Sequence, residues 1–301
     1  TNRLGEIWSG SISLSADSTV DAGSYIALSG NMGGTGRLTK VGNGSLSLSG
    51  VNSYSGGTQI NAGTLALGSA DALGSSGTIG FGGGTLRFGA ANTTDYSARF
   101  ATAAGQAYRL DTNGQDISLS ANLASSGGTL VKLGAGTLTL LGSTTYSGAT
   151  MIAGGRLVIR NDAPQLGTSG FSGAGSLTLE PVAGSFSAAT YTLSTPINGL
   201  SGLVIGKSGN TAGLNLTGAL SVAGPVSVFA GDLSMNTSLS STASGDLLLK
   251  SSGIFNIASG QQISASAGDI TLVANRFVNQ AGAGALSTTG EHVWRIWSTN
   301  S

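Results

Sequence analysis

Short triplets of the form apolar-x-apolar recur along the whole chain, separated by glycine and small polar residues. Representative triplets are Ile12–Leu14, Leu46–Leu48, Leu65–Leu67, Leu138–Leu140, Leu157–Ile159, Leu177–Leu179, Leu214–Leu216 and Ile270–Leu272. Side chains on a β-strand alternate between its two faces, so each triplet predicts a short strand with one buried face. Glycine turns such as Gly42–Gly44 and Gly134–Gly136 follow within a few positions. Helical spacing is not sustained anywhere, so the pattern favours an all-β fold.

One long motif occurs twice, 92 residues apart. Residues 36–68 read GRLTKVGNGSLSLSGVNSYSGGTQINAGTLALG, and residues 128–159 read GTLVKLGAGTLTLLGSTTYSGATMIAGGRLVI. The identical pairs include Gly36 and Gly128, Lys40 and Lys132, Gly42 and Gly134, Gly44 and Gly136, Tyr54 and Tyr146, Gly56 and Gly148, and Gly63 and Gly155. Self-similarity at a fixed period indicates stacked units, each covering the apolar face of the next.

Strands this short are unstable alone, but they become stable when each pairs with its equivalents in the coils above and below. With about 20 to 25 residues and about 4.8 Å per coil, the length predicts on the order of thirteen coils. We therefore expect residues 1–301 to form one continuous single-stranded parallel β-helix, a β-solenoid in the shape of an elongated rod. The two homologous repeats occupy residues 20–74 and 110–167 of it.

The composition excludes several classes of protein. The 301 residues include 51 Gly, only 9% are charged, and 13 basic residues balance 13 acidic residues for a net charge of +0. Such a balance does not favour nucleic acid or an anionic membrane surface as a partner. There is no cysteine, so neither disulfides nor thiolate metal sites hold the fold, which fits a secreted bacterial surface chain.

The sequence shows no membrane or export segment of its own. No stretch approaches the roughly 18 consecutive apolar residues of a membrane-spanning helix. The first residues, TNRLGEIWSG, lack the basic and then apolar pattern of a secretory signal. Because the chain opens on Thr1, we interpret it as a processed product or an excised segment, with any export signal or anchor elsewhere.

The repeated motif resembles the autotransporter-associated repeat of bacterial surface passenger domains. The residues that carry the resemblance follow the pattern G-x-L-x-K-x-G-x-G-[ST]-L-[ST]-L-x-G-x-x-x-Y-S-G-x-T, with a glycine before the next apolar pair. Upstream segments at 25–32 and 108–123 are similar to the strand and turn that lead into such a repeat. A third copy starts at Gly202–Lys207 but never reaches the Tyr-Ser-Gly element.

The C-terminal third, residues 202–301, resembles the filamentous haemagglutinin family of two-partner secretion adhesins, most clearly at 268–300. The residues in the family's places are Asn279, Gly282, Ala285, Leu286, Ser287, Trp294 and Trp297. Asp232, Asp246 and Asp269 each lie between a turn glycine and a strand. Both resemblances imply a right-handed parallel β-helix on the outer surface of bacteria, and neither implies a catalytic function.

Candidate catalytic and metal-binding groups are few. The single histidine, His292, lies beside Glu291, but no G-x-S-x-G turn supplies a nucleophile, so a surface or cap role is favoured. The glycine-rich stretches at 33–36 and 82–86 lack the aspartate of calcium-binding β-rolls and the Gly-Lys-[Ser/Thr] of a phosphate loop. We expect no catalytic site, no metal and no cofactor.

Paired carboxylates are the signature of polysaccharide-processing enzymes, several of which are parallel β-helices. Two pairs have suitable spacing, Asp111 with Asp116 and Asp17 with Asp21. Turn chemistry accounts for both pairs, because aspartate accepts hydrogen bonds from local backbone donors. The aspartates at 232, 246 and 269 recur with the coils, which favours a turn or ladder role over a catalytic dyad.

Two further residue types recur in the motif. Tyr54 and Tyr146 could stack on sugars, but their equivalent placement favours equivalent structural positions, with the rings packed over a turn. Lys40, Lys132 and Lys207 are expected on an outer turn of the coil.

The tryptophans lie near the two ends of the chain. Exposed terminal coils must be covered or they recruit another sheet edge, so Trp8, Trp294 and Trp297 are expected to cover the core there, the last two as an aromatic C-terminal cap. The sharper alternative is that the ends are adhesive and that rods join end to end into a fibre.

These observations predict a non-catalytic extracellular or outer-surface protein of bacteria that acts as an adhesin passenger, a stalk or a filament-forming unit. The interactions open to it are self-association, end to end or side by side, and binding to glycans or other cell surfaces. The alternative is a polysaccharide lyase or hydrolase on the same fold. A carboxylate pair facing a groove would favour that enzyme.

Overall fold

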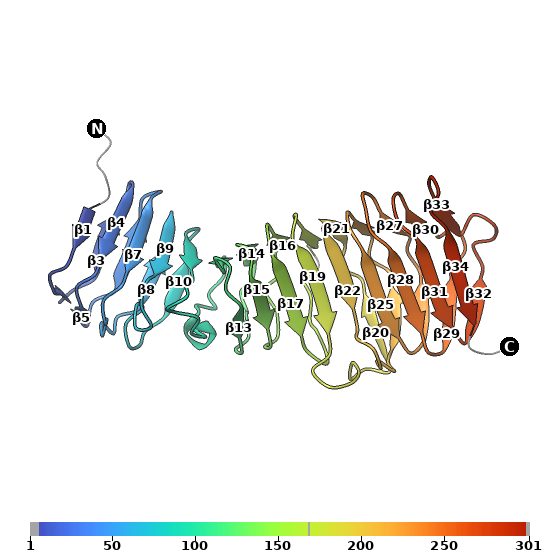
Figure 1. Ribbon diagram of the computed structural model, residues 1–301. Coiled ribbons are helices and arrows are strands. Elements are labelled where there is room, and N and C mark those ends of the chain that lie inside the picture. Colours follow the sequence, from blue (N-terminus) through green and yellow to red (C-terminus); the bar gives the residue numbers. More distant parts are fainter. Residues whose placement is uncertain (1–5, 168, 299–301) are drawn as a thin grey trace. The chain divides into compact units, whose positions relative to one another are not determined.

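The computed structural model describes residues 6–167 and 169–298, and the chain divides into two compact units, residues 1–148 and 149–301. Each unit consists of short parallel strands stacked from coil to coil (Figure 1). In the described residues the helical element is one 3-10 turn, η1 (Ser97–Arg99), and no helix is long and apolar enough to cross a membrane. The prediction of an all-β fold of stacked parallel strands is therefore confirmed.

In the first unit, one sheet runs in the order β1 (Glu6–Trp8), β4 (Tyr25–Leu28), β7 (Ser45–Leu48), β9 (Thr64–Leu67), β11 (Thr85–Arg87), β12 (Ala107–Asp111) and β14 (Thr129–Leu133). A second sheet contains β3 (Ser18–Asp21), β6 (Leu38–Val41), β8 (Thr58–Ile60) and β10 (Ile79–Phe81). Two smaller pairs are β2 (Ile12–Leu14) with β5 (Met32–Gly34), and β13 (Ile117–Leu119) with β15 (Thr137–Leu140).

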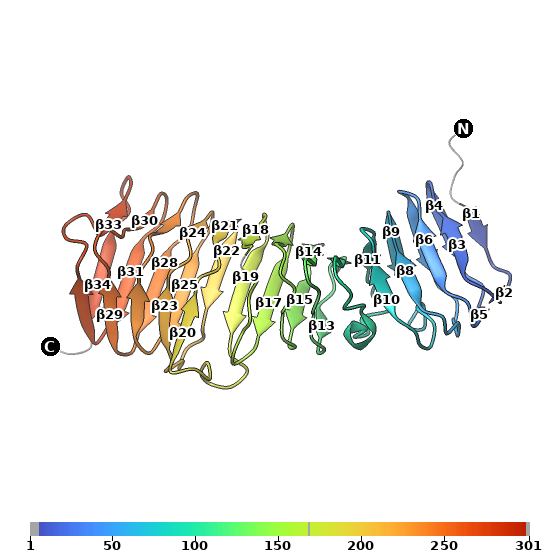
Figure 2. The same ribbon diagram turned by 180° about the vertical axis from the view of Figure 1, so that it is seen from behind.

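The second unit is likewise built of stacks, whose strands follow one another in both views (Figures 1 and 2). The first runs through β16 (Thr150–Ile152), β18 (Phe171–Ser172), β21 (Ile197–Leu200), β24 (Leu220–Val222), β27 (Leu239–Ser241), β30 (Ile263–Ala265) and β33 (Leu286–Thr288). The next, called here the β17–β34 sheet, runs through β17 (Arg156–Arg160), β19 (Ser176–Glu180), β22 (Gly202–Ile205), β25 (Val226–Ala230), β28 (Leu247–Ser251), β31 (Ile270–Ala274) and β34 (Trp294–Ser298). The last contains β20 (Thr190–Leu193), β23 (Gly213–Leu216), β26 (Leu233–Met235), β29 (Ile254–Ile257) and β32 (Arg276–Asn279).

Partner residues lie one coil apart in the sequence, and the coils differ in length. Leu214 pairs with Leu233 across a short coil, whereas Ser176 pairs with Gly202 across a longer one. This register stacks like on like, so the apolar residues of the triplets form continuous inward rows. One such row in the first unit is Ile26, Leu46, Leu65, Leu86 and Leu110. Burying each leucine is worth about 1.5 to 3 kcal/mol, and only the neighbouring coils can provide that burial.

An insertion between β11 and β12 changes which face of the coil the repeat occupies. β6 and β14 are equivalent in the motif, yet β6 lies in the sheet with β3 and β8, and β14 lies in the sheet with β9 and β12. Residues 88–106 intervene. Asp95 fastens this segment, because its Oδ1 accepts the backbone N–H of Ser97 and its Oδ2 accepts that of Ser120, each at 2.8 Å. The two copies of the motif, 92 residues apart, therefore have the same local structure but lie on different faces of the coil.

Candidate functional site

The lysines of the repeated motif are inside the protein. Lys40 and Lys132 are both 0% exposed, so the prediction that they lie on an outer turn is wrong. Lys40 stacks between Val20 and Ile60 in an inward row, and Lys132 follows Leu110 in another. The amine must therefore find its partners at the corner of the coil.

Turn carbonyls satisfy both ammonium groups. Lys40 Nζ donates to the carbonyl oxygens of Val41 and Gly42, each at 2.7 Å, and to that of Ala62 at 3.1 Å. Lys132 Nζ donates in the same way to the two residues that follow it, at 2.9 and 2.8 Å, and also to Thr112 Oγ1 at 3.0 Å. Each lysine thus closes the turn that follows it. The first of its carbonyl partners, that of Val41 or Leu133, also accepts a backbone N–H from the preceding coil, so the ammonium is a second donor there.

Lys207, from the incomplete third copy, behaves differently. The inward place of the motif lysine is taken there by Ile205, which is 0% exposed and pairs with Leu179 and Val228. Lys207 lies two residues later in the turn, where Nζ donates to the carbonyl oxygens of Pro181 and Val182 at 3.0 and 3.1 Å. The expectation of an outer turn holds for Lys207 alone.

The buried ammonium of Lys132 makes stability depend on pH. Desolvation by burial lowers the pKa of Lys132 to about 8, with Asp111 and Asp116 opposing that shift, and it lowers the pKa of Lys40 as well. Because the folded pKa lies below the unfolded value of about 10.5, the charged form costs folding free energy below pH 8. That cost is relieved as the pH rises from about 8 toward 10.5. Urea unfolding between pH 7.5 and 9.5 should therefore show the wild type gaining stability relative to Lys132→Met. Parallel pH profiles for the two proteins would contradict this.

The tyrosines of the motif are also inside and are not available to stack on sugars. Tyr54 is 0% exposed and Tyr146 is 2% exposed. The hydroxyl of Tyr54 lies 2.8 Å from Thr58 Oγ1, and burial raises the pKa of that tyrosine to about 12. The ring of Tyr146 packs against that of Tyr108, with the centroids 6.4 Å apart. Both rings are therefore core residues.

The aspartates satisfy backbone donors, in most cases in the next coil. Carboxylate Oδ1 atoms accept backbone N–H groups from one coil later in several cases: Asp17 from Arg37, Asp116 from Thr137, Asp162 from Ala183, Asp232 from Ile254, Asp246 from Asp269, and Asp269 from Val293. Asp111 instead accepts the N–H of Asn113 at 2.9 Å, two residues along a turn. The N–H of Thr137 lowers the pKa of Asp116, and that of Val293 lowers the pKa of Asp269. These bonds are the turn and ladder roles that the sequence indicated.

His292 has a partner that its sequence neighbours did not reveal. Its Nδ1 lies 3.5 Å from Asp269 Oδ1, and the other oxygen of Asp269 accepts a 2.6 Å bond from Arg295 Nη1. Because Asp269 belongs to the preceding coil, only the coil register brings the two together. The imidazole is exposed, and no group of three or more His, Cys, Asp or Glu able to hold a metal occurs in the described residues.

Two of the three tryptophans lie where end-covering residues should be. Trp8 pairs with Leu28 and Trp294 with Ile270, so both continue inward rows, and they are 58% and 53% exposed. Trp297 pairs with Val273 on the outer face and does not cover the core, so that part of the predicted aromatic cap is wrong.

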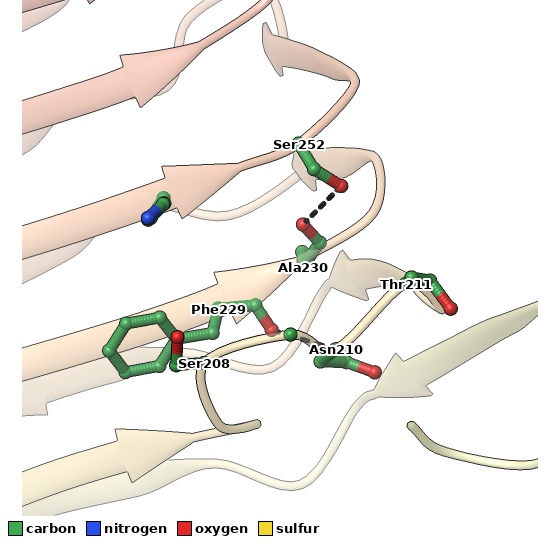
Figure 3. Close-up of a pocket in the computed structure, with 8 residues that line it drawn as sticks. Ser208, Asn210, Thr211, Phe229, Ala230 and Ser252 are labelled. Atoms are coloured by element: carbon green, nitrogen blue, oxygen red, sulfur yellow. Dashed lines mark hydrogen bonds between the residues drawn. The ribbon is translucent and has the colours of Figure 1, made fainter. Parts of the chain in front are cut away.

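Two depressions with room for a ligand lie on the outer face of the β17–β34 sheet. A groove of about 450 Å³ is lined by Arg156, Ser176, Thr178, Ser201, Gly202, Leu203, Val204, Pro225 and Ser227. A pocket of about 110 Å³ follows further along the same sheet, lined by Ser208, Gly209, Asn210, Thr211, Phe229, Ala230, Lys250 and Ser252 (Figure 3). Neither depression is lined by a carboxylate. The sequence did not indicate them, because they form only when residues from several coils lie side by side.

Comparison with known proteins places the repeated motif in a family. Residues 38–67 and 130–159 match the model of the Passenger-associated-transport-repeat. Over 141 residues the chain is 38% identical to the Adhesin BmaC autotransporter of Brucella suis biovar 1 (strain 1330). That stretch is 44% of this chain but 3% of the relative, so the similarity concerns a small part of a very long protein. No solved structure gives a significant match to the chain.

Proposed function

We propose that this chain is a segment of an autotransporter passenger that lies outside the bacterial cell and acts there as a non-enzymatic adhesin. The observation that carries the proposal is the coincidence of the two Passenger-associated-transport-repeat matches with coils whose lysine and tyrosine are core residues. The similarity to an autotransporter adhesin supports the same assignment.

The fold supports an adhesive role through repetition. On the outer face of the first stack in the second unit, the register aligns short polar residues from coil to coil: Ser172, Asn198, Ser221, Ser240, Ser264 and Ser287. Many weak contacts presented at a fixed spacing bind a repetitive surface more strongly than one of them could. The enzyme alternative has no comparable support, since the groove and the pocket on the β17–β34 sheet have no carboxylate lining.

Three further features of this proposal stay predictions. They are self-association of the chain into filaments, the uninterrupted continuation of one β-helix through residues 1–301, and the likeness of residues 202–301 to haemagglutinin adhesins. Each concerns how coils continue or associate, and the proposed adhesive role does not depend on them.

Antibodies raised against this chain test the proposal in the source bacterium. Intact cells should be labelled as strongly as permeabilised cells, protease added outside should remove the label, and Fab fragments should reduce attachment of the bacteria to host cells and surfaces. Incubation of the purified chain with common polysaccharides should release no reducing ends. Labelling that requires permeabilisation contradicts the surface location, and Fab fragments that label cells without reducing attachment contradict the adhesive role.

A further inference from the structure

In the part of the chain that the structure describes, the strip of the β17–β34 sheet between Arg156 and Lys250 combines three properties of a ligand site: cations without a carboxylate partner, hydroxyls without a hydrogen bond, and a depression. We propose that this strip binds an acidic polysaccharide. The proposal deepens the adhesive function above and rests on it for its biological setting.

The cations have no acidic partner. Arg156, at the start of β17, holds its guanidinium over the groove by donating from Nε and Nη2 to Thr178 Oγ1, at 3.1 and 2.9 Å. Within the described residues no carboxylate pairs with Arg156, and Lys250 on β28 has neither an ion pair nor a hydrogen bond from its ammonium. Both side chains are exposed. In a protein with so few charges, two unpaired cations beside depressions without carboxylates favour an anionic ligand.

The groove between the cations is lined by hydroxyls that the fold does not use. Ser176, Ser201 and Ser227 line it, and among the described residues their hydroxyls make no hydrogen bond. A hydroxyl both donates and accepts, as the hydroxyls of a sugar do. The volume of the groove, about 450 Å³, lies within the range of small-molecule sites. The groove can therefore accommodate sugar units whose hydroxyls pair with these serines.

The pocket at the far end adds an aromatic surface. Phe229 faces outward from β25 beside Lys250, its partner on β28, and it lines the pocket together with Ser208 (Figure 3). An aromatic ring packs well on the apolar face of a sugar while the ammonium beside it attracts a carboxylate or sulfate. The amide of Asn210 already has a partner, because Nδ2 donates to the carbonyl of Phe229 at 2.8 Å. The group in this pocket that can recognise the acid is therefore the ammonium of Lys250.

The spacing favours a polymer over a small molecule. Arg156 and Lys250 lie four strand steps apart in the order β17, β19, β22, β25 and β28, which is about 19 Å along the stack. The register also puts Lys250 level with Arg160, four residues or about 13 Å further along the strand direction. A single sugar acid cannot reach both cations, whereas an extended chain lying across the strands can. A nucleic acid is disfavoured because its affinity comes from many phosphate contacts, and this strip offers two cations.

Gly202 provides a way to block the groove without changing its charge. The residue lies between Ser176 and the Pro225 turn, its φ is not in the left-handed region, and an added Cβ would meet no atom closer than 3.6 Å. The Gly202→Leu variant should therefore fold normally, and the leucine side chain should fill the groove. This separates binding in the groove from general attraction to a basic surface.

Isothermal titration calorimetry of the full chain tests the proposal with polygalacturonate, dextran sulfate and unmodified dextran. We expect binding to polygalacturonate or dextran sulfate, with the better ligand identifying the acid, and none to dextran. The double variant Arg156→Gln, Lys250→Gln should weaken that binding about 100-fold, at about tenfold for each cation contact. Gly202→Leu should weaken it at least about tenfold by excluding the sugar.

The matched control is the double variant Arg37→Gln, Arg276→Gln, which removes the same charge from elsewhere on the chain. It should change the affinity by less than about twofold. Thermal unfolding followed by circular dichroism checks that every variant is folded. Failure of both acidic polymers to bind overturns the proposal. So does equal binding of dextran, or binding that survives both the double variant and Gly202→Leu. Each of these outcomes leaves the surface labelling and Fab experiments untouched, so the adhesive function stands or falls separately.

Discussion

Gly44→Ala should lower the free energy of unfolding by about 3 kcal/mol, because it forces a methyl group into the backbone of the preceding coil. A Cβ at this position would overlap the carbonyl oxygen of Ser24, and one at the equivalent Gly136 would overlap that of Gln115. Backbone cannot move aside as a flexible side chain can. Gly44 is also held on both sides, since its N–H donates to Ala22 at 2.7 Å and its carbonyl accepts from Thr64 at 3.0 Å.

Gly23→Ala is the matched control for this experiment. It lies in the corresponding corner of the preceding coil, but an added Cβ meets nothing within 4 Å, and its φ is not in the left-handed region. Urea unfolding of the two variants should therefore separate them clearly, with Gly23→Ala within about 0.5 kcal/mol of the wild type. Equal loss of stability in both would mean that neighbouring coils do not approach as closely as the structure shows.

Tyr108→Ala should lower the free energy of unfolding by about 3 to 5 kcal/mol, because the ring fills the core beside the 88–106 insertion. Tyr108 is 0% exposed and packs against Phe81 and Phe100, with centroids 5.4 and 6.1 Å away. Its hydroxyl donates to the carbonyl of Ala101 at 2.8 Å and lies 3.1 Å from that of Ala124. The ring therefore joins the insertion to the coil that follows it.

Tyr108→Phe distinguishes the ring from its hydroxyl. This variant keeps the packing and loses the hydrogen bonds, so it should cost about 1 kcal/mol. Urea unfolding followed by far-ultraviolet circular dichroism measures both changes. If Tyr108→Phe cost as much as Tyr108→Ala, the hydroxyl rather than the aromatic cluster would hold the insertion in place.

The fold could be predicted from the sequence because its signal is local and repeated. Each triplet predicts which side chains face inward, and the repeat at 92 residues indicates that the units stack. For the two motif lysines, charge and position in the strand make opposite predictions: the charge favours an outer turn, and the position favours the core. Lys40 stands two residues after Leu38, as Lys132 does after Leu130, and this alternation puts both on the inward side. That parity is the signal that could have placed them correctly.

The remaining features depend on which coils are adjacent, and a single sequence does not state this. Coil length varies, as the short coil from Leu214 to Leu233 and the longer one from Ser176 to Gly202 show, so no fixed offset finds the partner of a given side chain. The sequence therefore indicates Glu291 as the carboxylate beside His292, whereas the structure brings Asp269 to it. For the same reason the groove beside Arg156 could not be anticipated, because it needs Gly202 to lie next to Ser176.

The central claim is that successive coils stack in register at one strand spacing, and distances between spin labels test it most directly. The chain has no cysteine, so single cysteines at outward positions can be labelled selectively. Double electron–electron resonance should give about 24 Å between the backbones at Ser172 and Ser287, five strand steps apart, and about 19 Å between Asn198 and Ser287, four steps apart. Distances that fail to shorten by about one strand spacing per coil would contradict the stacked solenoid.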